Sequence, residues 1–131
     1  MSRQVRMTIG VRWADLDALG HVNNATFLTY LEECRDLFMR ETLGEVFLDM
    51  VIARVGIDYR AEIPAGTPRV DVTCALDSIG TSSIRTREQI LLPDGSVAAE
   101  SITVAVVRDR ESRTSRPWTD SERSALGSID T

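Results

Sequence analysis

The stretch WADLDALGHVNNATFLTYLEE, residues 13–33, joins a turn rich in Asp, Gly, His and Asn to the start of an amphipathic helix. In its helical part, large apolar side chains recur every three or four residues, and polar side chains fall on the opposite side. The apolar positions are Phe27, Tyr30, Leu31, Cys34, Leu37 and Phe38, and the polar positions are Thr29, Glu33, Asp36 and Arg40. Because Gly44 supplies a helix end, the pattern predicts a helix over about residues 24–42.

Five β-like segments surround this helix in the sequence. Residues 3–12 alternate apolar and polar side chains, which is typical of a half-buried strand. Four later segments are rich in β-branched residues and are separated by turn residues: 50–63, 69–79, 82–92 and 97–109. Short turns between the last three predict an antiparallel meander. The predicted class is therefore α+β, with one long helix against a five-stranded antiparallel sheet in the order β-α-β-β-β-β.

A single domain over residues 1–131 is expected, because the length suits one hydrophobic core and no linker or repeat interrupts it. Residues 110–131 read as a polar tail in which Thr119 or Asp120 caps a short terminal helix. A helix with one apolar stripe covers only one face of the sheet. The other face and the sheet edges need cover, which favours a homo-oligomer.

Composition and charge exclude several classes of function. Hydrophobic residues make up 43% and charged residues 27%, as in ordinary globular proteins, and the net charge of −5 disfavours nucleic acids and anionic membranes as partners. Without an apolar run long enough for a signal peptide or membrane span, a cytoplasmic location is expected. The two cysteines, Cys34 and Cys74, match no metal motif and are expected to be reduced and buried. Neither a metal nor a cofactor is predicted.

The turn before the helix contains the candidate functional residues. Asp15 and Asp17 precede Gly20, and Asn23 or Asn24 is placed to cap the helix. The first amide N–H groups of a helix lack intrahelical partners and attract developing negative charge, so this end is a candidate oxyanion site. A carboxylate beside it either stabilises the turn or acts as nucleophile or general base. The residues alone leave both roles open.

The single histidine of the chain, His21, lies in the same turn. A Ser-His-Asp hydrolase is not expected, since no G-x-S-x-G motif occurs. His21 could bind substrate, tune the neighbouring carboxylate, or make one structural hydrogen bond. Metal binding by His21 with Asp15 and Asp17 is disfavoured, because adjacent residues in a turn rarely form a coordination sphere.

The pattern D-x-D-x-x-G-H-V-N-N over residues 15–24, followed by TFLTYLEECR over 26–35, resembles hotdog-fold acyl-CoA thioesterases of the 4-hydroxybenzoyl-CoA thioesterase type. A weaker similarity continues through VDVTCALDSIGTSSIRTREQILLPDGSVAAESITVAVVRDR, residues 70–110. The resemblance implies a sheet wrapped around one central helix, and a homodimer or dimer of dimers in which two sheets become continuous. It also implies that Asp17 is the catalytic carboxylate and that the backbone N–H of Asn24 holds the thioester carbonyl.

On this resemblance, the expected reaction is hydrolysis of an acyl-CoA thioester to a free acid and CoA, and acyl-CoA is the expected partner. Asp15 is expected to stabilise the turn rather than to act as a second base. The expected substrate contacts are His21, Asn23, Phe27, Arg85 and Arg110. Phe27, together with Leu31, is expected to line the acyl pocket. The candidates for binding the CoA phosphates are Arg85, Arg87, Arg108 and Arg110. These arginines could equally be solvated at strand edges. Two alternatives are a hotdog dehydratase acting on an acyl thioester and a non-catalytic acyl-CoA binding module.

Overall fold

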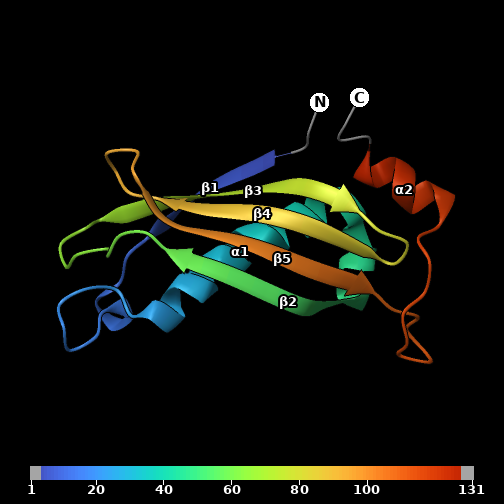
Figure 1. Cartoon of the computed structure of the whole chain (residues 1–131), viewed down its shortest axis with the longest axis horizontal. Coiled ribbons are helices and arrows are strands. Elements are labelled where there is room, and N and C mark those ends of the chain that lie inside the picture. The colour runs from blue at the N-terminus through green and yellow to red at the C-terminus, as the bar shows by residue number, and fades with distance from the viewer. Residues whose placement is uncertain (1–3, 128–131) are drawn as a thin grey trace.

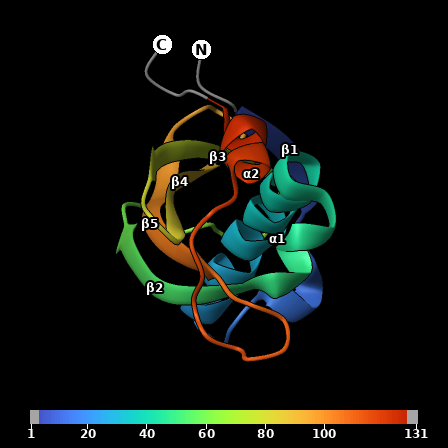
Figure 2. The same cartoon turned by 90° about the vertical axis from the view of Figure 1, so that its right-hand side faces the viewer.

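A computed structural model describes residues 4–127, in which one long helix lies in the concave face of a curved antiparallel sheet (Figures 1 and 2). The helix, α1, spans Asn24–Leu43, and the sheet has the strand order β1-β3-β4-β5-β2. The strands are β1 (Gln4–Gly10), β2 (Met50–Tyr59), β3 (Arg69–Ile79), β4 (Ser83–Leu91) and β5 (Val97–Val107). The predicted α+β class and element order are confirmed.

Four predicted strands extend too far, one of them, 82–92, by a single residue at each end. The first ends at Gly10 instead of residue 12, because the chain turns into the short 3-10 segment η1 (Trp13–Asp15). The second ends at Tyr59 instead of residue 63. The backbone amides of Arg60 and Ala61 both donate to the carbonyl of Ala98, so the regular hydrogen bonding between β2 and β5 stops there. The last ends at Val107 instead of residue 109. The predicted strand start at residue 3 lies outside the described residues.

The helix begins and ends where its capping residues require. Of the two candidate caps, Asn23 takes the role, and its side-chain oxygen accepts from the amide of Ala25 at 2.7 Å. At the other end, Gly44 adopts φ 60° and begins the 3-10 segment η2 (Gly44–Asp49). Most of the predicted apolar stripe is buried, but Leu37 is only half-buried, as is Asp36 on the predicted polar side.

A charged pair lies in the core between helix and sheet, where the apolar pattern predicted no charge. Arg35 is 4% exposed and Glu88 is fully buried. One oxygen of Glu88 accepts from Ser101 Oγ at 2.7 Å, Thr103 Oγ1 at 2.8 Å and Arg35 Nη1 at 3.3 Å. Alternation along β4 and β5 turns these side chains inward, so a polar stripe crosses the sheet beneath α1.

Both cysteines are free and buried, as predicted. The Cys34 thiol donates to the carbonyl of Val72 at 3.3 Å, and Cys74 lies 3.7 Å from a carboxylate oxygen of Glu88. Burial, with the nearby Glu88 charge, raises the pKa of Cys34 to about 12. Both thiols therefore stay protonated and unreactive near neutral pH.

The tail closes one end of the core. The terminal helix α2 (Asp120–Leu126) is capped by Thr119, the first of the two predicted candidates. Trp118 is 6% exposed and its indole N–H donates to the carbonyl of Ser83 at 3.0 Å. Hydrogen bonds from Arg116 lower the pKa of Glu122 to about 2, which keeps this ion pair charged at neutral pH. The remaining tail residues, 128–131, lie outside the described part of the chain.

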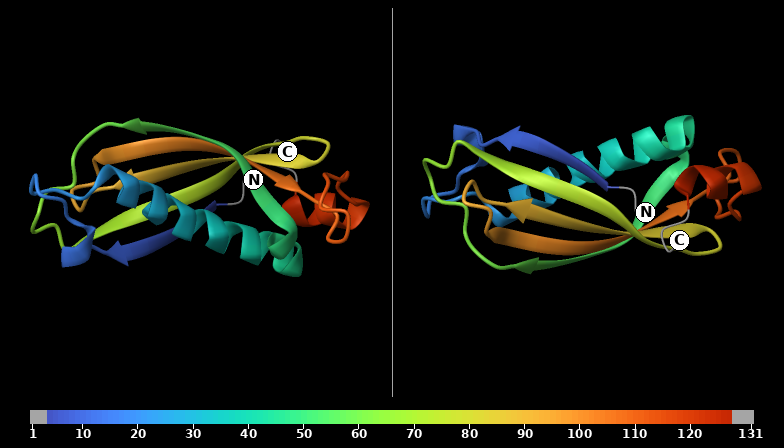
Figure 3. Two further views of the ribbon diagram at one scale, coloured as in Figure 1. Left: turned by 90° about the horizontal axis from the view of Figure 1, so that it is seen from below. Right: turned by 90° about the horizontal axis from the view of Figure 1, so that it is seen from above.

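The helix packs over β1, β3 and β4 and leaves the inner face of β2 open (Figure 3). β2 is an edge strand. The inward positions Ile52, Val55 and Tyr59 are 43%, 38% and 44% exposed, which is unusual for large apolar side chains on a concave face. An apolar strip along β2 is therefore left without cover within one chain.

The buried ion pair gives a test of this core. Replacing Glu88 by Ala leaves Arg35 charged and unpaired, and should lower the free energy of unfolding by about 3–5 kcal/mol. The double variant Arg35→Met/Glu88→Leu should lose less, because neither charge is then buried alone. Urea denaturation followed by circular dichroism measures both, with the exposed Glu33→Ala on α1 as the matched control. A loss below about 1 kcal/mol for Glu88→Ala would contradict this view of the pair.

Candidate active site

Asp15 fixes the turn that precedes α1. Its side chain is 2% exposed and accepts from the Tyr30 hydroxyl at 2.6 Å, the Arg12 amide at 2.9 Å and the Arg12 guanidinium at 2.8 Å. Burial alone would raise the pKa of Asp15, but the hydrogen bonds from Arg12 and Tyr30 outweigh it and hold the pKa below the usual range. Asp15 is thus a charged anchor between the turn and the second turn of the helix.

Asp17 occupies a different environment two residues later. Its side chain is 22% exposed, and only one carboxylate oxygen is held, by the amide of Leu19 at 2.9 Å. Its backbone closes the turn, because the Asp17 amide donates to the carbonyl of His21 at 2.9 Å and Gly20 adopts φ 90°. The second carboxylate oxygen accepts no hydrogen bond from any residue that the structure describes. Asp17 therefore has a fixed backbone and an oxygen available for chemistry.

His21 lies between two carboxylates. Its Nδ1 is 3.6 Å from Asp17 Oδ2 and 3.3 Å from the carbonyl of Val22, and its Nε2 is 3.8 Å from Glu62 Oε2. A β-bridge to Pro64 ties this part of the turn to the segment after β2. The imidazole therefore lies beside the free oxygen of Asp17 without a hydrogen bond to it.

The start of α1 presents an unused donor beside this turn. The Asn23 carbonyl accepts from Thr26 at 2.9 Å and its side-chain oxygen caps Ala25, whereas the amide N–H of Asn24 donates to none of the residues in 4–127. The hydroxyl of Tyr59 donates to the Asn24 carbonyl at 2.9 Å, which holds the following peptide, Asn24–Ala25, from the β2 side. A free amide at a helix N-terminus is a suitable donor to an oxyanion.

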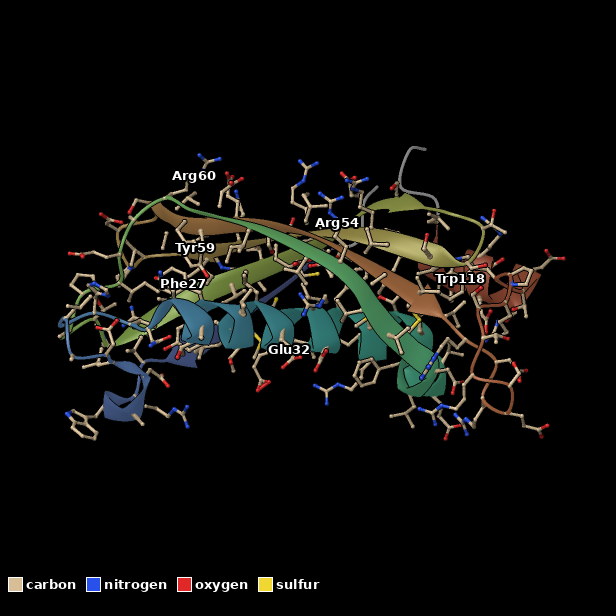
Figure 4. All side chains as sticks on the ribbon, turned by 60° about the horizontal axis from the view of Figure 1, so that its bottom comes forward. Phe27, Glu32, Arg54, Tyr59, Arg60 and Trp118 are labelled. Carbon is tan, nitrogen blue, oxygen red and sulfur yellow. The ribbon has the colours of Figure 1, made fainter. Side chains whose placement is uncertain are left out.

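The remaining predicted contacts are not gathered at this turn. Phe27 and Leu31 are 1% and 0% exposed and belong to the core, where the Phe27 ring meets Tyr59 edge to face at 5.1 Å (Figure 4). Arg85 lies on the outer face of β4, 3.9 Å from Asp77. Arg110 pairs with Asp49 at 2.9 Å, beyond the C-terminal end of α1 and about 30 Å of helix away from Asn24.

The structure adds residues that the sequence did not single out. Tyr30 and Tyr59 hold the two sides of the site, yet an aromatic residue in a helix or strand pattern predicts only burial. Arg60 follows Tyr59 at the same end of α1 (Figure 4). It is 55% exposed and pairs with Glu100 at 3.0 Å. It is an accessible cation at the end of the molecule where the Asp17 turn lies.

A groove runs along α1 away from this end. It has a volume of about 380 Å³ and lies between the helix and the open inner face of β2. It is lined by Leu28, Thr29, Glu32, Arg35, Ile52 and Val55. Leu28, 41% exposed and one turn after Asn24, faces this space where Phe27 and Leu31 were expected.

The described residues offer neither a metal centre nor a membrane-spanning helix. No three His, Cys, Asp or Glu side chains between residues 4 and 127 are grouped so that they could hold a metal ion. Within the same range, no helix combines the length and apolar character that crossing a bilayer requires.

The buried carboxylate predicts how the fold responds to acid. Folding lowers the pKa of Asp15, so its ion pair with Arg12 stabilises the fold at pH values above the unfolded-state pKa of about 3.9. This contribution to the free energy of unfolding is lost as the pH falls from about 5 through the pKa of the folded state. Asp15→Asn should cost roughly 1–3 kcal/mol at pH 7 and flatten the loss of stability between pH 5 and 2. Denaturant unfolding at several pH values measures this, with the exposed Asp58→Asn as the control. An unchanged pH slope in Asp15→Asn would contradict the assignment.

Comparison with known proteins connects this geometry to a family. The sequence profile of the thioesterase-like superfamily matches residues 11–126. A thioesterase from Thermus thermophilus, solved in complex with coenzyme A and Zn, is 31% identical and superposes with a TM-score of 0.85 over 94% of this chain and 97% of its own. A predicted thioesterase from Bacillus stearothermophilus is 27% identical, with a TM-score of 0.82 over 95% and 94%. Among curated proteins, none matches the chain in sequence.

The described fold and these relatives agree with each other. One long helix against a curved five-stranded sheet is the arrangement expected of the hotdog fold, and the matched residues include the turn, α1 and every strand after it. The chain therefore belongs to the thioesterase-like superfamily and is a thioesterase of the hotdog fold.

Proposed function

We propose that this enzyme hydrolyses acyl-CoA thioesters to a free carboxylic acid and CoA, with Asp17 as the catalytic carboxylate and the amide of Asn24 as the donor to the carbonyl. The observation that carries the proposal is the free Asn24 N–H at the helix start, next to a turn whose Asp17 has one unbonded carboxylate oxygen. Coenzyme A as the carrier is supported by the Thermus thermophilus thioesterase that was solved with it.

The proposed chemistry places the thioester carbonyl oxygen at the Asn24 N–H. Negative charge grows on this oxygen as the carbonyl carbon becomes tetrahedral, and the amide and helix dipole stabilise it. Asp17 either attacks the carbonyl carbon, forming an anhydride that water then opens, or takes a proton from the attacking water. In both routes the C–S bond breaks, CoA leaves as the thiolate, and the acyl group leaves as the acid.

The residues around Asp17 have supporting roles in this proposal. His21, between Asp17 and Glu62, orients the free carboxylate oxygen and borders the substrate. The side-chain oxygen of Asn23 caps the helix by accepting from the Ala25 amide, so the side-chain NH₂ group of Asn23 can donate to the substrate. We place Arg85 and Arg110 as contacts to CoA bound at another subunit, because both lie away from Asp17 in their own chain.

We further propose that the protein is a homodimer, or a dimer of dimers, in which two β2 edges pair and the two sheets become continuous. β2 is an edge strand with unpaired backbone groups on one side, and its inner face exposes Ile52 and Val55. Long edges with exposed apolar side chains recruit a second strand unless they are protected. Pairing of this kind would also bring helix α1 of the second subunit toward the open side of the groove between α1 and β2.

Removing the charge of Asp17 tests the catalytic proposal. Asp17→Asn should lower kcat for acyl-CoA hydrolysis by about 10²–10⁴-fold while unfolding stays close to that of the wild type, because the side chain is partly exposed and holds only Leu19. Release of free thiol measures the rate, and Asp58→Asn, another accessible carboxylate, is the control. Near wild-type hydrolysis by Asp17→Asn would refute the proposal. Hydration of a 2-enoyl thioester without thiol release would instead indicate a dehydratase.

The proposed dimer has its own test. Light scattering during gel filtration should give at least twice the 14.5 kDa mass of one chain. Placing a charge on the β2 edge with Ile52→Lys should shift the protein toward monomer. Leu19→Lys, at a residue 79% exposed in the turn before α1, is the matched control and should leave the mass unchanged. An unchanged mass for Ile52→Lys would argue against pairing through β2.

A further inference from the structure

The peptide that follows the proposed oxyanion donor is held at both ends. Its carbonyl, which belongs to Asn24, accepts from the Tyr59 hydroxyl at 2.9 Å. Its N–H, which belongs to Ala25, donates to the Asn23 side chain at 2.7 Å. The preceding peptide is held through the Asn23 carbonyl, which accepts from the Thr26 amide at 2.9 Å. Asn24 therefore lies between two fixed peptides, and its own N–H donates to none of the described residues.

Tyr59 is the partner in this group that comes from outside the turn and the helix. Among the described residues, the other hydrogen bonds to the backbone of residues 23–25 come from Asp15 in the turn or from α1 and its cap. An α-helix already pairs each carbonyl with the amide four residues later, so α1 does not need a second donor at Asn24. The hydroxyl of a half-exposed side chain could equally donate to water. Helix formation alone therefore does not explain the bond from Tyr59.

The Tyr59 side chain is itself held in place by the sheet and the core. Its backbone is the last residue of β2 and pairs with Ala99 of β5, and the next amide, that of Arg60, donates to the Ala98 carbonyl at 2.8 Å. Its ring meets the buried ring of Phe27 edge to face at 5.1 Å, beside the start of α1 (Figure 4). The hydroxyl is thus a fixed link from the sheet to the first residue of the helix.

Such a link matters because an oxyanion donor depends on its position. The N–H must point at the place that the oxygen takes in the transition state, and a misplacement of about 1 Å can lower the rate about 10²-fold. The ends of helices fray, and the proposed donor is the first amide of α1. A brace from outside the helix would keep this amide in one orientation.

We propose that Tyr59 is a positioning residue for the reaction. Its hydroxyl holds the Asn24–Ala25 peptide, so that the neighbouring Asn24 N–H stays aimed at the thioester carbonyl. Tyr59 acts through the backbone and not by touching the substrate, so it affects the rate of the chemical step and not binding. This inference rests on the proposed function, because it assigns a support to the donor named there.

The first test removes the hydroxyl alone. Tyr59→Phe keeps the ring against Phe27, and it should lower kcat for acyl-CoA hydrolysis by about threefold to tenfold with KM unchanged, as expected when one hydrogen bond that favours the transition state is lost. Release of free thiol measures the rate. Asp58→Asn, at the adjacent and 74% exposed residue of β2, is the matched control and should keep the wild-type kcat.

The outcomes of this test separate the inference from the proposed function. Unchanged kcat in Tyr59→Phe, or a higher KM in place of a lower kcat, would overturn the role of Tyr59 and leave thioester hydrolysis standing. No thiol release by the wild type from any acyl-CoA would overturn the proposed function, and the role of Tyr59 with it.

The second tyrosine of the chain provides a comparison for stability. Tyr30→Phe removes a donor from the buried carboxylate of Asp15, so it should lower the free energy of unfolding. Tyr59→Phe should not, because Tyr59 is 44% exposed and the Asn24 carbonyl keeps its partner within the helix. Urea denaturation measures both variants. An equal loss of stability in the two would show that Tyr59 has a structural role only, and would overturn the inference.

A last measurement follows the braced peptide itself. The Ala25 N–H belongs to the peptide that Tyr59 holds, so its hydrogen exchange, measured by NMR, should be about threefold to tenfold faster in Tyr59→Phe than in the wild type. Amides in the middle of α1, such as that of Cys34, should exchange as in the wild type. A lower kcat without faster exchange at Ala25 would show that the hydroxyl acts on the substrate directly, and would overturn the positioning role.

Discussion

The hydrogen bond from Tyr30 to buried Asp15 is the interaction that sets the arrangement of the site. At 2.6 Å it joins the turn before α1 to the second turn of the helix, and Arg12 holds the other side of the same carboxylate. With this anchor in place, the backbone between Asp15 and Asn23 is closed by short hydrogen bonds, including the Asn23 amide to the Asp15 carbonyl at 2.9 Å. The first amide of the helix and the Asp17 side chain then share one rigid segment.

The two aspartates of the turn illustrate how environment separates structural from chemical roles. Asp15 is buried and both of its oxygens accept hydrogen bonds, so it has no capacity left for a substrate. Asp17 is partly exposed and keeps one oxygen unbonded, with His21 at 3.6 Å from it. Two carboxylates this close in sequence can have different functions when one is saturated and the other is accessible. This contrast is the structural reason for choosing Asp17 in the proposed mechanism.

Much of the fold was predictable because local patterns determined it. The spacing of Phe27, Tyr30 and Leu31 predicted α1, and short turns predicted the order of the last three strands. Strand ends were less predictable, since contacts between distant segments end them, as Ala98 does for β2. Asn23 and Asn24 were equally good caps by sequence, and only the backbone separates the cap from the free amide. Alternation with Ile84 and Ile90 could have placed Glu88 on the inner face, but its pairing with Arg35 depends on how α1 packs on the sheet. The groove was not predictable, because the open side of β2 follows from the packing of α1 toward β1, β3 and β4.

In the proposed complex, the carbonyl of a bound acyl-CoA lies between the Asn24 amide and Asp17. A crystal structure with a non-hydrolysable acyl-CoA analogue that keeps the carbonyl but replaces the thioester sulfur by a methylene group tests this placement directly. We expect the carbonyl oxygen at about 2.7–3.2 Å from Asn24 N, and the carbonyl carbon, or a water against it, at about 3–3.5 Å from an Asp17 oxygen. A carbonyl bound to another donor, with Asp17 out of reach, would contradict the proposed mechanism.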